Sequence, residues 1–258
     1  MTPGVGEAIQ ALAADGVIVG FTNRIGGVSR KPYDEANIST KVGDDPGAVQ
    51  TNRRLQLDRF SLTGRPLATV RQAHTATVVV ISTGIETSSG ATSPLALPVV
   101  ADGMVTRQRG VVLMVGVADC APVVLVDAAS GVIGLLHVGW RGLVRGLVAQ
   151  GVTWMATLGA RPHSTLALIG PSIGPCCFPV QRDVWTAVQA DVPAAACTGA
   201  GESLRVDLRA GITHQLHDVG VTGVSWAQTC TAGNPERYFS ARRQAGVTGV
   251  QAGLACLL

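Results

Sequence analysis

Residues 118–142 read ADCAPVVLVDAASGVIGLLHVGWRG, and this stretch decides the fold. Two apolar runs flank residues 127–131, whose small and polar side chains favour a tight turn, so the stretch predicts a β-hairpin. If the turn is centred near Ala129, the numbers of paired residues sum to about 258, and His137 lies opposite position 121. The hairpin therefore brings the Cys120 thiol and the His137 imidazole to the same end of one sheet.

Other short segments predict the rest of the architecture. Further strands are expected at 17–22, 67–72, 77–81, 111–117, 166–169 and 250–257. Helices are expected at 45–57, 140–158, 179–190 and 207–219. Because strands and helices do not alternate regularly, the pattern favours an α+β fold with a mixed or antiparallel sheet. No repeat or long linker divides the chain, so we expect one domain over residues 1–258, with 82–98 as a surface loop.

Composition limits the classes of function. The chain has 258 residues, 47% of them hydrophobic, which is enough for a substantial core. Lys and Arg exceed Asp and Glu by only three (20 against 17), which gives no reason to expect nucleic acid or a membrane as partner. The N-terminus lacks the pattern of a secretory signal, and the six cysteines lack the spacing of a disulfide scaffold. These features predict a cytoplasmic protein.

A cysteine and a histidine brought together admit three interpretations. They are a packed pair in the core, a cysteine nucleophile with a histidine base, or a metal site that needs a further ligand. His74, in the segment VRQAH, is the candidate third ligand, since His163 follows an evident loop and His214 and His217 fall in a solvated helical pattern. Two histidines and one cysteine with an open fourth position are typical of catalytic zinc.

The order of short motifs along the chain is more specific than any one of them. The motifs read TNRIGGVSRKPYDEANIS, VGDDPGAVQTNRR, VRQAH, ADGMVT, VADCAPVVLVD, LHVGWRG, IGPSIGPCCFPV, Cys230-Thr231 and FSARR. In this order, from about Val17 to Leu257, the chain resembles the YfiH-like or laccase-domain family, whose members are also called polyphenol oxidase-like or peptidoglycan editing factor proteins. One departure is Ala241, where the family often has an aromatic residue.

The resemblance implies a fold, a metal and an activity. The fold is a single α+β domain with a mixed β-sandwich flanked by helices. The metal is zinc, held by His74, Cys120 and His137. The activity is phosphorolysis of adenosine, inosine, guanosine or methylthioadenosine to base and sugar 1-phosphate, together with deamination of adenosine. The expected partners are therefore a small nucleoside and phosphate, and a monomer is a plausible oligomeric state.

Several polar residues are candidates for substrate binding or catalysis. Arg24 lies in the Gly-rich segment NRIGG and is predicted to hold phosphate, because glycine lets a ligand approach the backbone closely. Arg141, directly after the second hairpin strand, is predicted to face the same cavity. Asn37 and Arg53 are weaker candidates of the same kind. Asp119 is a candidate to orient a metal-binding histidine.

The remaining candidates are residues for which packing or solvent exposure is the simpler role. Trp140 is a candidate to stack on a purine, although core packing is the simpler role. Cys176 and Cys177 either line the pocket or pack beside it. Arg242 and Arg243 form a charge pair of a kind that is usually solvated.

Three alternatives to the zinc phosphorylase remain open. An amidase that edits peptidoglycan precursors would use the same cysteine, histidines and zinc. A copper phenol oxidase would also use two histidines and a cysteine, but a multicopper cluster needs many more histidines than the five present. A binding protein with a structural zinc would need a fourth protein ligand. The usual zinc-deaminase signature is absent, so the general acid or base of a deamination is not identified.

Overall fold

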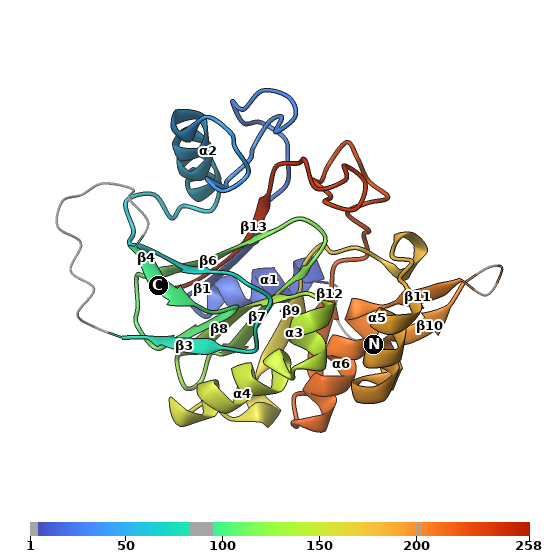
Figure 1. The fold of residues 1–258 in the computed structure, drawn as a ribbon. Helices are drawn as coiled ribbons and strands as arrows, with labels where there is room; N and C mark the ends of the chain where they lie inside the picture. Colours follow the sequence, from blue (N-terminus) through green and yellow to red (C-terminus); the bar gives the residue numbers. More distant parts are fainter. Residues whose placement is uncertain (1–4, 83–94, 200, 202) are drawn as a thin grey trace.

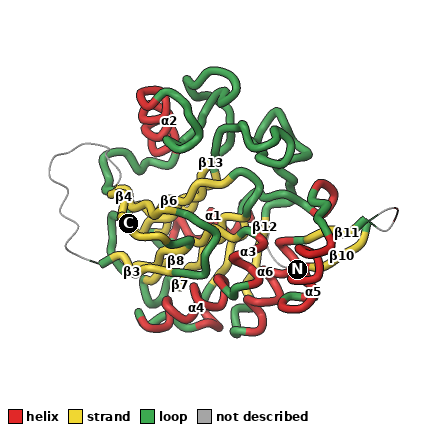
Figure 2. The backbone as a smooth tube through the Cα atoms, viewed as in Figure 1, coloured by secondary structure: helices red, strands yellow, loops and turns green. Residues whose placement is uncertain are grey.

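Two mixed β-sheets packed face to face form the centre of the molecule (Figures 1 and 2). The computed structural model describes residues 5–82, 95–199, 201 and 203–258. In order across the larger sheet, the strands are β12 (Gly223–Trp226), β9 (Leu166–Ile169), β7 (Ala121–Asp127), β8 (Val132–Val138), β5 (Gly103–Thr106) and β3 (Val78–Ile81). The smaller sheet contains β1 (Val17–Phe21), β13 (Gln251–Leu257), β6 (Val112–Val117), β2 (Leu67–Arg71) and β4 (Leu95–Val100).

Each sheet contains both parallel and antiparallel pairs. In the larger sheet β3 runs parallel to β5, whereas β5, β8, β7 and β9 pair antiparallel. In the smaller sheet β2 runs parallel to β4 and β6, whereas β13 is antiparallel to both of its neighbours. A third, two-stranded sheet joins β10 (Ala196–Thr198) to β11 (Leu204–Val206). The predicted α+β fold with a mixed β-sandwich is confirmed.

The predicted hairpin is β7–β8, with a register that differs by one residue. Its pairs run from Asp127 opposite Val132 to Ala121 opposite Val138 and include Pro122 opposite His137, so paired numbers sum to 259 and not to the predicted 258. The difference arises because the loop holds four residues, 128–131, and its centre falls after Ala129. Cys120 directly precedes β7, so its thiol still lies at the same end of the sheet as His137.

The hairpin is buried on both faces. Val124 and Val126 point between the sheets and pack with Val115 of β6. Val123 and Leu125 point to the opposite face, where the helices cover the larger sheet. Because successive side chains of a strand alternate between faces, a continuous apolar run is required here.

The helices lie mainly on one side of the sandwich. Figure 1 shows α3, α4, α5 and α6 below the larger sheet and α2 above the smaller one. Their bounds are α1 (Val5–Ala14), α2 (Pro46–Arg59), α3 (Trp140–Val144), α4 (Leu147–Thr157), α5 (Arg182–Asp191) and α6 (Leu208–Asp218). Asp45 caps α2 by accepting from the Ala48 amide at 2.7 Å, as the sequence predicts. None of the helices in the described residues is long and apolar enough to cross a membrane.

Some predicted boundaries were wrong. The helix expected over 140–158 is two helices, because Gly146 adopts φ +75° between α3 and α4. The helix expected from Pro179 begins at Arg182. Of the loop expected over 82–98, residues 83–94 lie outside the described residues, and Leu95 already begins β4. Strands β5 and β10–β12 and helix α1 were not predicted.

Asp127 ties the hairpin turn to the loop before β9. Its buried carboxylate accepts from the Arg161 amide at 2.8 Å and from the Ser164 hydroxyl at 3.1 Å. Burial raises the pKa of this carboxyl, but the hydrogen bonds of Arg161, Ser130 and Ser164 outweigh burial and lower it. A lowered pKa in the folded state means that the charged form stabilises the fold above the unfolded-state pKa of about 3.9, and that this contribution is lost at lower pH.

We therefore predict that Asp127→Ala lowers the free energy of unfolding by about 1–3 kcal/mol at pH 7, since it removes the charged acceptor of the Arg161 amide and the Ser164 hydroxyl. Urea unfolding between pH 7 and pH 2.5 measures this loss, which should shrink as the pH falls through the folded-state pKa. The exposed Asp191→Ala is the control and should change little. A loss that stays constant over the whole pH range would contradict the assigned role of the carboxylate.

Candidate metal and active site

His74, Cys120 and His137 converge at one end of the larger sheet. Their ligand atoms all lie within 4.8 Å of one another, and the two imidazole ring centres are 5.0 Å apart. Cys120 enters from the start of β7, His137 from the end of β8, and His74 from the loop after β2. In the described residues this group includes no fourth His, Cys, Asp or Glu. The arrangement leaves one position of a tetrahedral ion open.

Asp102 orients both histidines. One carboxylate oxygen lies 2.8 Å from His137 Nδ1, and the Asp102 carbonyl accepts from the His137 amide at 2.7 Å. The other oxygen accepts from the Thr75 amide at 2.6 Å and from the Ala73 amide at 3.2 Å. This fully buried carboxylate therefore leaves His137 Nε2 for a ligand and fixes the backbone on both sides of His74.

The His74 backbone is held in a conformation that non-glycine residues rarely adopt, with φ +57°. Arg145 stabilises it, because the guanidinium donates to the His74 carbonyl at 2.8 Å. The preceding Gln72 side chain anchors the loop to the smaller sheet, donating to the Gly116 carbonyl at 2.7 Å and accepting from its amide at 2.9 Å. The imidazole is thus positioned by bonds on both sides of the residue.

Gly139 leaves open the space into which the metal-ligand donor atoms of His74, Cys120 and His137 project. A Cβ at this position would lie 2.8 Å from Cys120 Sγ and 3.0 Å from His74 Nδ1. The backbone there has φ −93° and ψ 174°, which any residue can adopt. The need for glycine is therefore steric, and the volume that it leaves open adjoins the ligand atoms.

The charges within the group favour a thiolate. Burial raises the pKa of Cys120, but the charge of His137 and hydrogen bonds from both histidines outweigh it and lower the pKa to about 6. Burial lowers the pKa of His137, whereas the Cys120 thiolate and Asp102 raise it to about 9. In the absence of a cation, the pair is a thiolate beside an imidazolium, and the thiolate is the form that binds a metal.

The residues fit a bound zinc ion. One thiolate and two imidazoles are zinc ligands, and the orientation of His137 by a buried carboxylate is typical of such sites. The same donor set also suits copper, so the residues define a metal-capable group without fixing the metal. The three other histidines do not join it: His163 precedes β9, His214 pairs with Asp218 on α6, and His217 is exposed.

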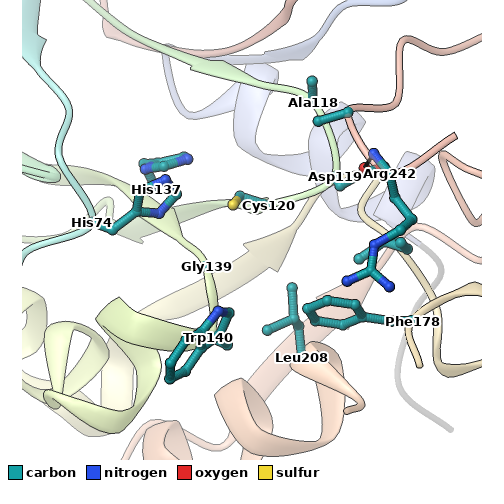
Figure 3. Close-up of a pocket in the computed structure, with 12 residues that line it drawn as sticks. His74, Ala118, Asp119, Cys120, His137, Gly139, Trp140, Phe178, Leu208 and Arg242 are labelled. Atoms are coloured by element: carbon teal, nitrogen blue, oxygen red, sulfur yellow. Dashed lines mark hydrogen bonds between the residues drawn. The ribbon is translucent and has the colours of Figure 1, made fainter. Parts of the chain in front are cut away.

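A cavity of about 440 Å³ opens in front of the three donors (Figure 3). This volume lies within the usual range for small-molecule sites, about 300–1,000 Å³. The apolar wall comprises Trp140, Ile173, Phe178 and Leu208. Arg242 lies beside Phe178, across the cavity from the two histidines, with its guanidinium carbon 5.0 Å from the centre of the Phe178 ring (Figure 3). The cavity thus combines aromatic surface, a cation and metal-capable donors.

Asp119 builds the cavity wall and does not contact a histidine. One carboxylate oxygen accepts from the Thr231 hydroxyl at 2.7 Å. The other accepts from the Ser240 hydroxyl at 3.0 Å and the Arg242 amide at 2.7 Å. The carboxylate that orients His137 is therefore Asp102, and the role suggested for Asp119 was wrong. Asp119 instead fixes the segment that carries Arg242 against the start of β7.

The predicted substrate-binding residues do not line this cavity. The Arg24 guanidinium donates to the Asp34 and Pro235 carbonyls and pairs with the Asp34 carboxylate at 3.0 Å. Asn37 is fully buried and accepts from the Val250 amide. Arg53 donates to the Ile38 carbonyl at 2.8 Å. Arg141 is exposed and stacks on Trp140, with 4.5 Å from its guanidinium carbon to a ring centre.

Sequence reasoning missed Asp102 as a site residue and gave Arg242 only a solvated role. Both lie in quoted motifs, Asp102 in ADGMVT and Arg242 in FSARR. A signal for Asp102 existed, because a lone acid directly before a buried strand needs a partner when it is buried. No such signal marked Arg242, which enters the cavity only because the C-terminal segment folds back onto Asp119.

The fold and site define a class of α+β protein with a two-histidine, one-cysteine group at the floor of a small-molecule cavity. Residues 18–258 match the family described as multi-copper polyphenol oxidoreductase laccase, and the chain belongs to that family. The resemblance seen in the sequence motifs is thereby confirmed.

Similar proteins cover nearly the whole chain. A purine nucleoside phosphorylase from Streptomyces coelicolor is 37% identical over 248 residues, 96% of this chain and 98% of the relative. Another from Corynebacterium glutamicum is 36% identical over 237 residues, 92% of this chain and 93% of the relative. The solved structure of YlmD from Geobacillus stearothermophilus has a TM-score of 0.84 at 27% identity and covers 94% of this chain and 92% of that one.

The first prediction for the site concerns Asp102. Asp102→Asn should weaken zinc binding by about 10–100-fold, because the His137 ring and the residue 73–75 backbone lose a charged acceptor. Competition with a chromophoric chelator measures the affinity. Asp127→Asn, a substitution of a buried aspartate in the hairpin turn, is the matched control. Equal affinities in the two variants would refute the role of Asp102.

A second prediction uses Gly139. Gly139→Ala should abolish metal binding while the protein stays folded, since the added methyl group meets Cys120 Sγ and His74 Nδ1 and strains no backbone angle. Metal content and circular dichroism of the purified variant measure the two effects. Gly6→Ala, at an open position on α1, is the control. A Gly139→Ala protein with full metal content would show that the donors do not share this space.

Proposed function

We propose that this protein is a zinc-dependent purine nucleoside phosphorylase that converts adenosine, inosine, guanosine or methylthioadenosine and phosphate to free base and sugar 1-phosphate. The observation that carries the proposal is that His74, Cys120 and His137 converge at the floor of a nucleoside-sized cavity that also contains Arg242. Relatives that match over more than nine-tenths of the chain are named purine nucleoside phosphorylases.

Zinc held by these three residues would supply a Lewis acid that polarises substrate oxygen. The chain contributes the geometry in which that chemistry operates. Asp102 keeps the His137 ring in one orientation and one tautomer, and the apolar wall gives a substrate a fixed surface to pack against. Both effects require rigid elements, and two of the donors lie at the ends of paired strands.

The aromatic part of the cavity suits a purine base. Trp140 and Phe178 both line it, and a flat heteroaromatic ring gains stacking energy against such faces. The metal-capable group lies beside Trp140, because His137 is separated from it by only two residues at the end of β8. We infer that the base packs on the aromatic wall and that the ribose lies between that wall and the donors.

Arg242 is the residue that we assign to phosphate. It is exposed in the cavity, and its recorded side-chain hydrogen bond is one from Nη1 to the Pro179 carbonyl at 2.6 Å. A guanidinium has five N–H donors, so others remain for a phosphate oxygen. Arg24, for which the same role was predicted from sequence, does not line the cavity and already makes four hydrogen bonds to Asp34 and Pro235. The neighbouring Arg243 donates to the Thr231, Ala232 and Tyr238 carbonyls.

Adenosine deamination is the second activity that we propose for the same cavity. In this reaction water adds at C6 of the adenine base and ammonia leaves, so phosphate takes no part and the rate should not depend on Arg242. We also propose a cytoplasmic location, supported by six cysteines that are all unpaired.

One observation favours a different chemistry as the second candidate. The Cys120 thiol lies beside two imidazoles and has a pKa of about 6, as expected for the nucleophile of a cysteine hydrolase such as a precursor-editing amidase. The cysteine hydrolase differs from the zinc-dependent phosphorylase in one measurable respect, because its free thiol would act best without zinc. The copper oxidase reading has less support, because three of the five histidines lie outside the group.

The proposed function is tested by incubating the purified protein with adenosine or inosine, with and without phosphate, and separating the products. Free base should form only with phosphate, should stop after zinc removal and should return when zinc is restored. His74→Ala should abolish it. Release of base that survives complete zinc removal contradicts the role of zinc, and no turnover of any purine nucleoside by the zinc-loaded protein refutes the phosphorylase.

Phosphate binding provides a separate prediction. Arg242→Ala should raise the KM for phosphate at least about 10-fold, because one charge-assisted hydrogen bond contributes about 1.5–3 kcal/mol. The deamination rate should stay within about 2-fold, since that reaction has no phosphate. Arg161→Ala, exposed before β9, is the control. If Arg24→Ala and not Arg242→Ala raises the phosphate KM, the assignment made from the sequence is the correct one.

A further inference from the structure

A second group of metal-capable side chains lies outside the site described above. Cys176 and Cys177 belong to a short 3₁₀ turn, Pro175–Cys177, and Cys230 follows β12. The three sulfur atoms lie within 4.8 Å of one another, with 3.5 Å between Cys176 Sγ and Cys177 Sγ. All three thiols are at least partly exposed, so an ion has access to them.

Backbone amides point at one of these sulfurs. The Gly174 amide donates to Cys230 Sγ at 3.2 Å, and the Gly233 amide donates to it at 3.4 Å. Amide donors favour a sulfur atom that carries negative charge. Two such donors at one sulfur stabilise a metal-binding thiolate more than they stabilise a neutral thiol in a core.

We propose that Cys176, Cys177 and Cys230 form a second metal site that binds a thiophilic d¹⁰ cation, Zn²⁺ or Cu⁺, through three thiolates. Soft thiolate ligands select these two ions over the hard cations. The two ions differ in how they complete the site. Zn²⁺ takes a fourth ligand, such as water, whereas Cu⁺ is satisfied by three sulfur atoms. The described residues add no fourth His, Cys, Asp or Glu to the group.

Charge in the surroundings supports a cation with three anionic ligands. The Arg243 guanidinium interacts with the charges of both Cys177 and Cys230, and offsets part of the negative charge that a Zn²⁺ ion with three thiolates would retain.

The position of the site gives it a structural consequence for the cavity. Phe178, which lines the cavity, directly follows Cys177, and Thr231, which donates to Asp119, directly follows Cys230. A single bridge, Ser172 with Cys230, already brings the two segments together. A bound ion would join the segment with Phe178 to the segment that Asp119 holds beside Arg242, and so fix two walls of the cavity.

The experiment uses full-length protein and three variants with a single cysteine replaced by serine. Cys120→Ser removes the thiolate of the first site, Cys230→Ser removes one thiolate of the proposed site, and Cys197→Ser, on β10, is the matched control. Each protein is titrated anaerobically with Co²⁺, as a spectroscopic substitute for Zn²⁺, and separately with Cu⁺ in competition with bicinchoninate. Thiolate-to-cobalt charge-transfer absorption reports the sulfur ligands.

The expected result is a thiolate-rich site that persists in Cys120→Ser and Cys197→Ser and is lost in Cys230→Ser. Strong cobalt charge transfer in Cys120→Ser identifies a Zn²⁺ site, whereas removal of copper from bicinchoninate without such absorption identifies a Cu⁺ site. If Cys230→Ser does not fold, Cys176→Ser at the exposed sulfur serves instead. The proposal is overturned if Cys120→Ser binds neither ion through sulfur, or if binding is unchanged in Cys230→Ser or Cys176→Ser.

Discussion

The contact between Asp102 and His137 is the constraint on which the site depends. A carboxylate that is fully buried must have hydrogen-bond partners. Asp102 finds them in the His137 ring and in the Ala73 and Thr75 amides. Because it stands directly before β5 and His137 lies near the end of the neighbouring β8, one carboxylate joins two paired strands to the loop that carries His74. The hydrogen bonds that the buried Asp102 carboxylate accepts therefore also position the metal-capable group.

The cavity depends on a second buried carboxylate with a comparable role. Asp119, with φ +97°, holds the Thr231 and Ser240 hydroxyls and the Arg242 amide against the start of β7. Asp102 thus fixes the histidines of the metal-capable group, and Asp119, which directly precedes Cys120, fixes the wall that faces them. This division explains how a chain with few aromatic residues, 4% of its length, builds a defined pocket from loops of distant sequence. The rigid hairpin positions the metal-capable group, and the walls come from loops and from the first residues of α3 and α6 (Figure 3).

Local sequence patterns predicted the hairpin well because its physics is local. A continuous apolar run buried on both faces, a small polar turn and the positions of Cys120 and His137 all lie within 25 residues, 118–142. The register was wrong by one residue, because composition does not distinguish a three-residue from a four-residue loop. The break of the following helix at Gly146 was missed, since a glycine within an apolar helical pattern is often tolerated.

Long-range contacts were harder to predict. His74 joins the group from 46 positions before Cys120, and the resemblance to a family, more than spacing, marked it as a ligand. Arg24 and Asn37 looked like ligand-binding residues because they are polar residues in a glycine-rich segment. In the structure they bind backbone carbonyls and amides, which is how a long loop without strands satisfies its own polar groups. A sequence pattern identifies polar residues but does not show which of them already hydrogen-bond within the protein, and this is why Arg242, which lines the cavity, replaced Arg24 as the candidate phosphate ligand.

The most direct test of the central claim is anomalous diffraction from crystals of the protein as purified, recorded just above and just below the zinc absorption edge. The account predicts an anomalous peak that appears only above the edge, lies between the His74, Cys120 and His137 side chains, and has its remaining coordination position directed into the cavity. A peak bound by a fourth protein side chain would contradict an open catalytic site. Well-ordered crystals with no peak among these three residues would contradict the assignment of zinc.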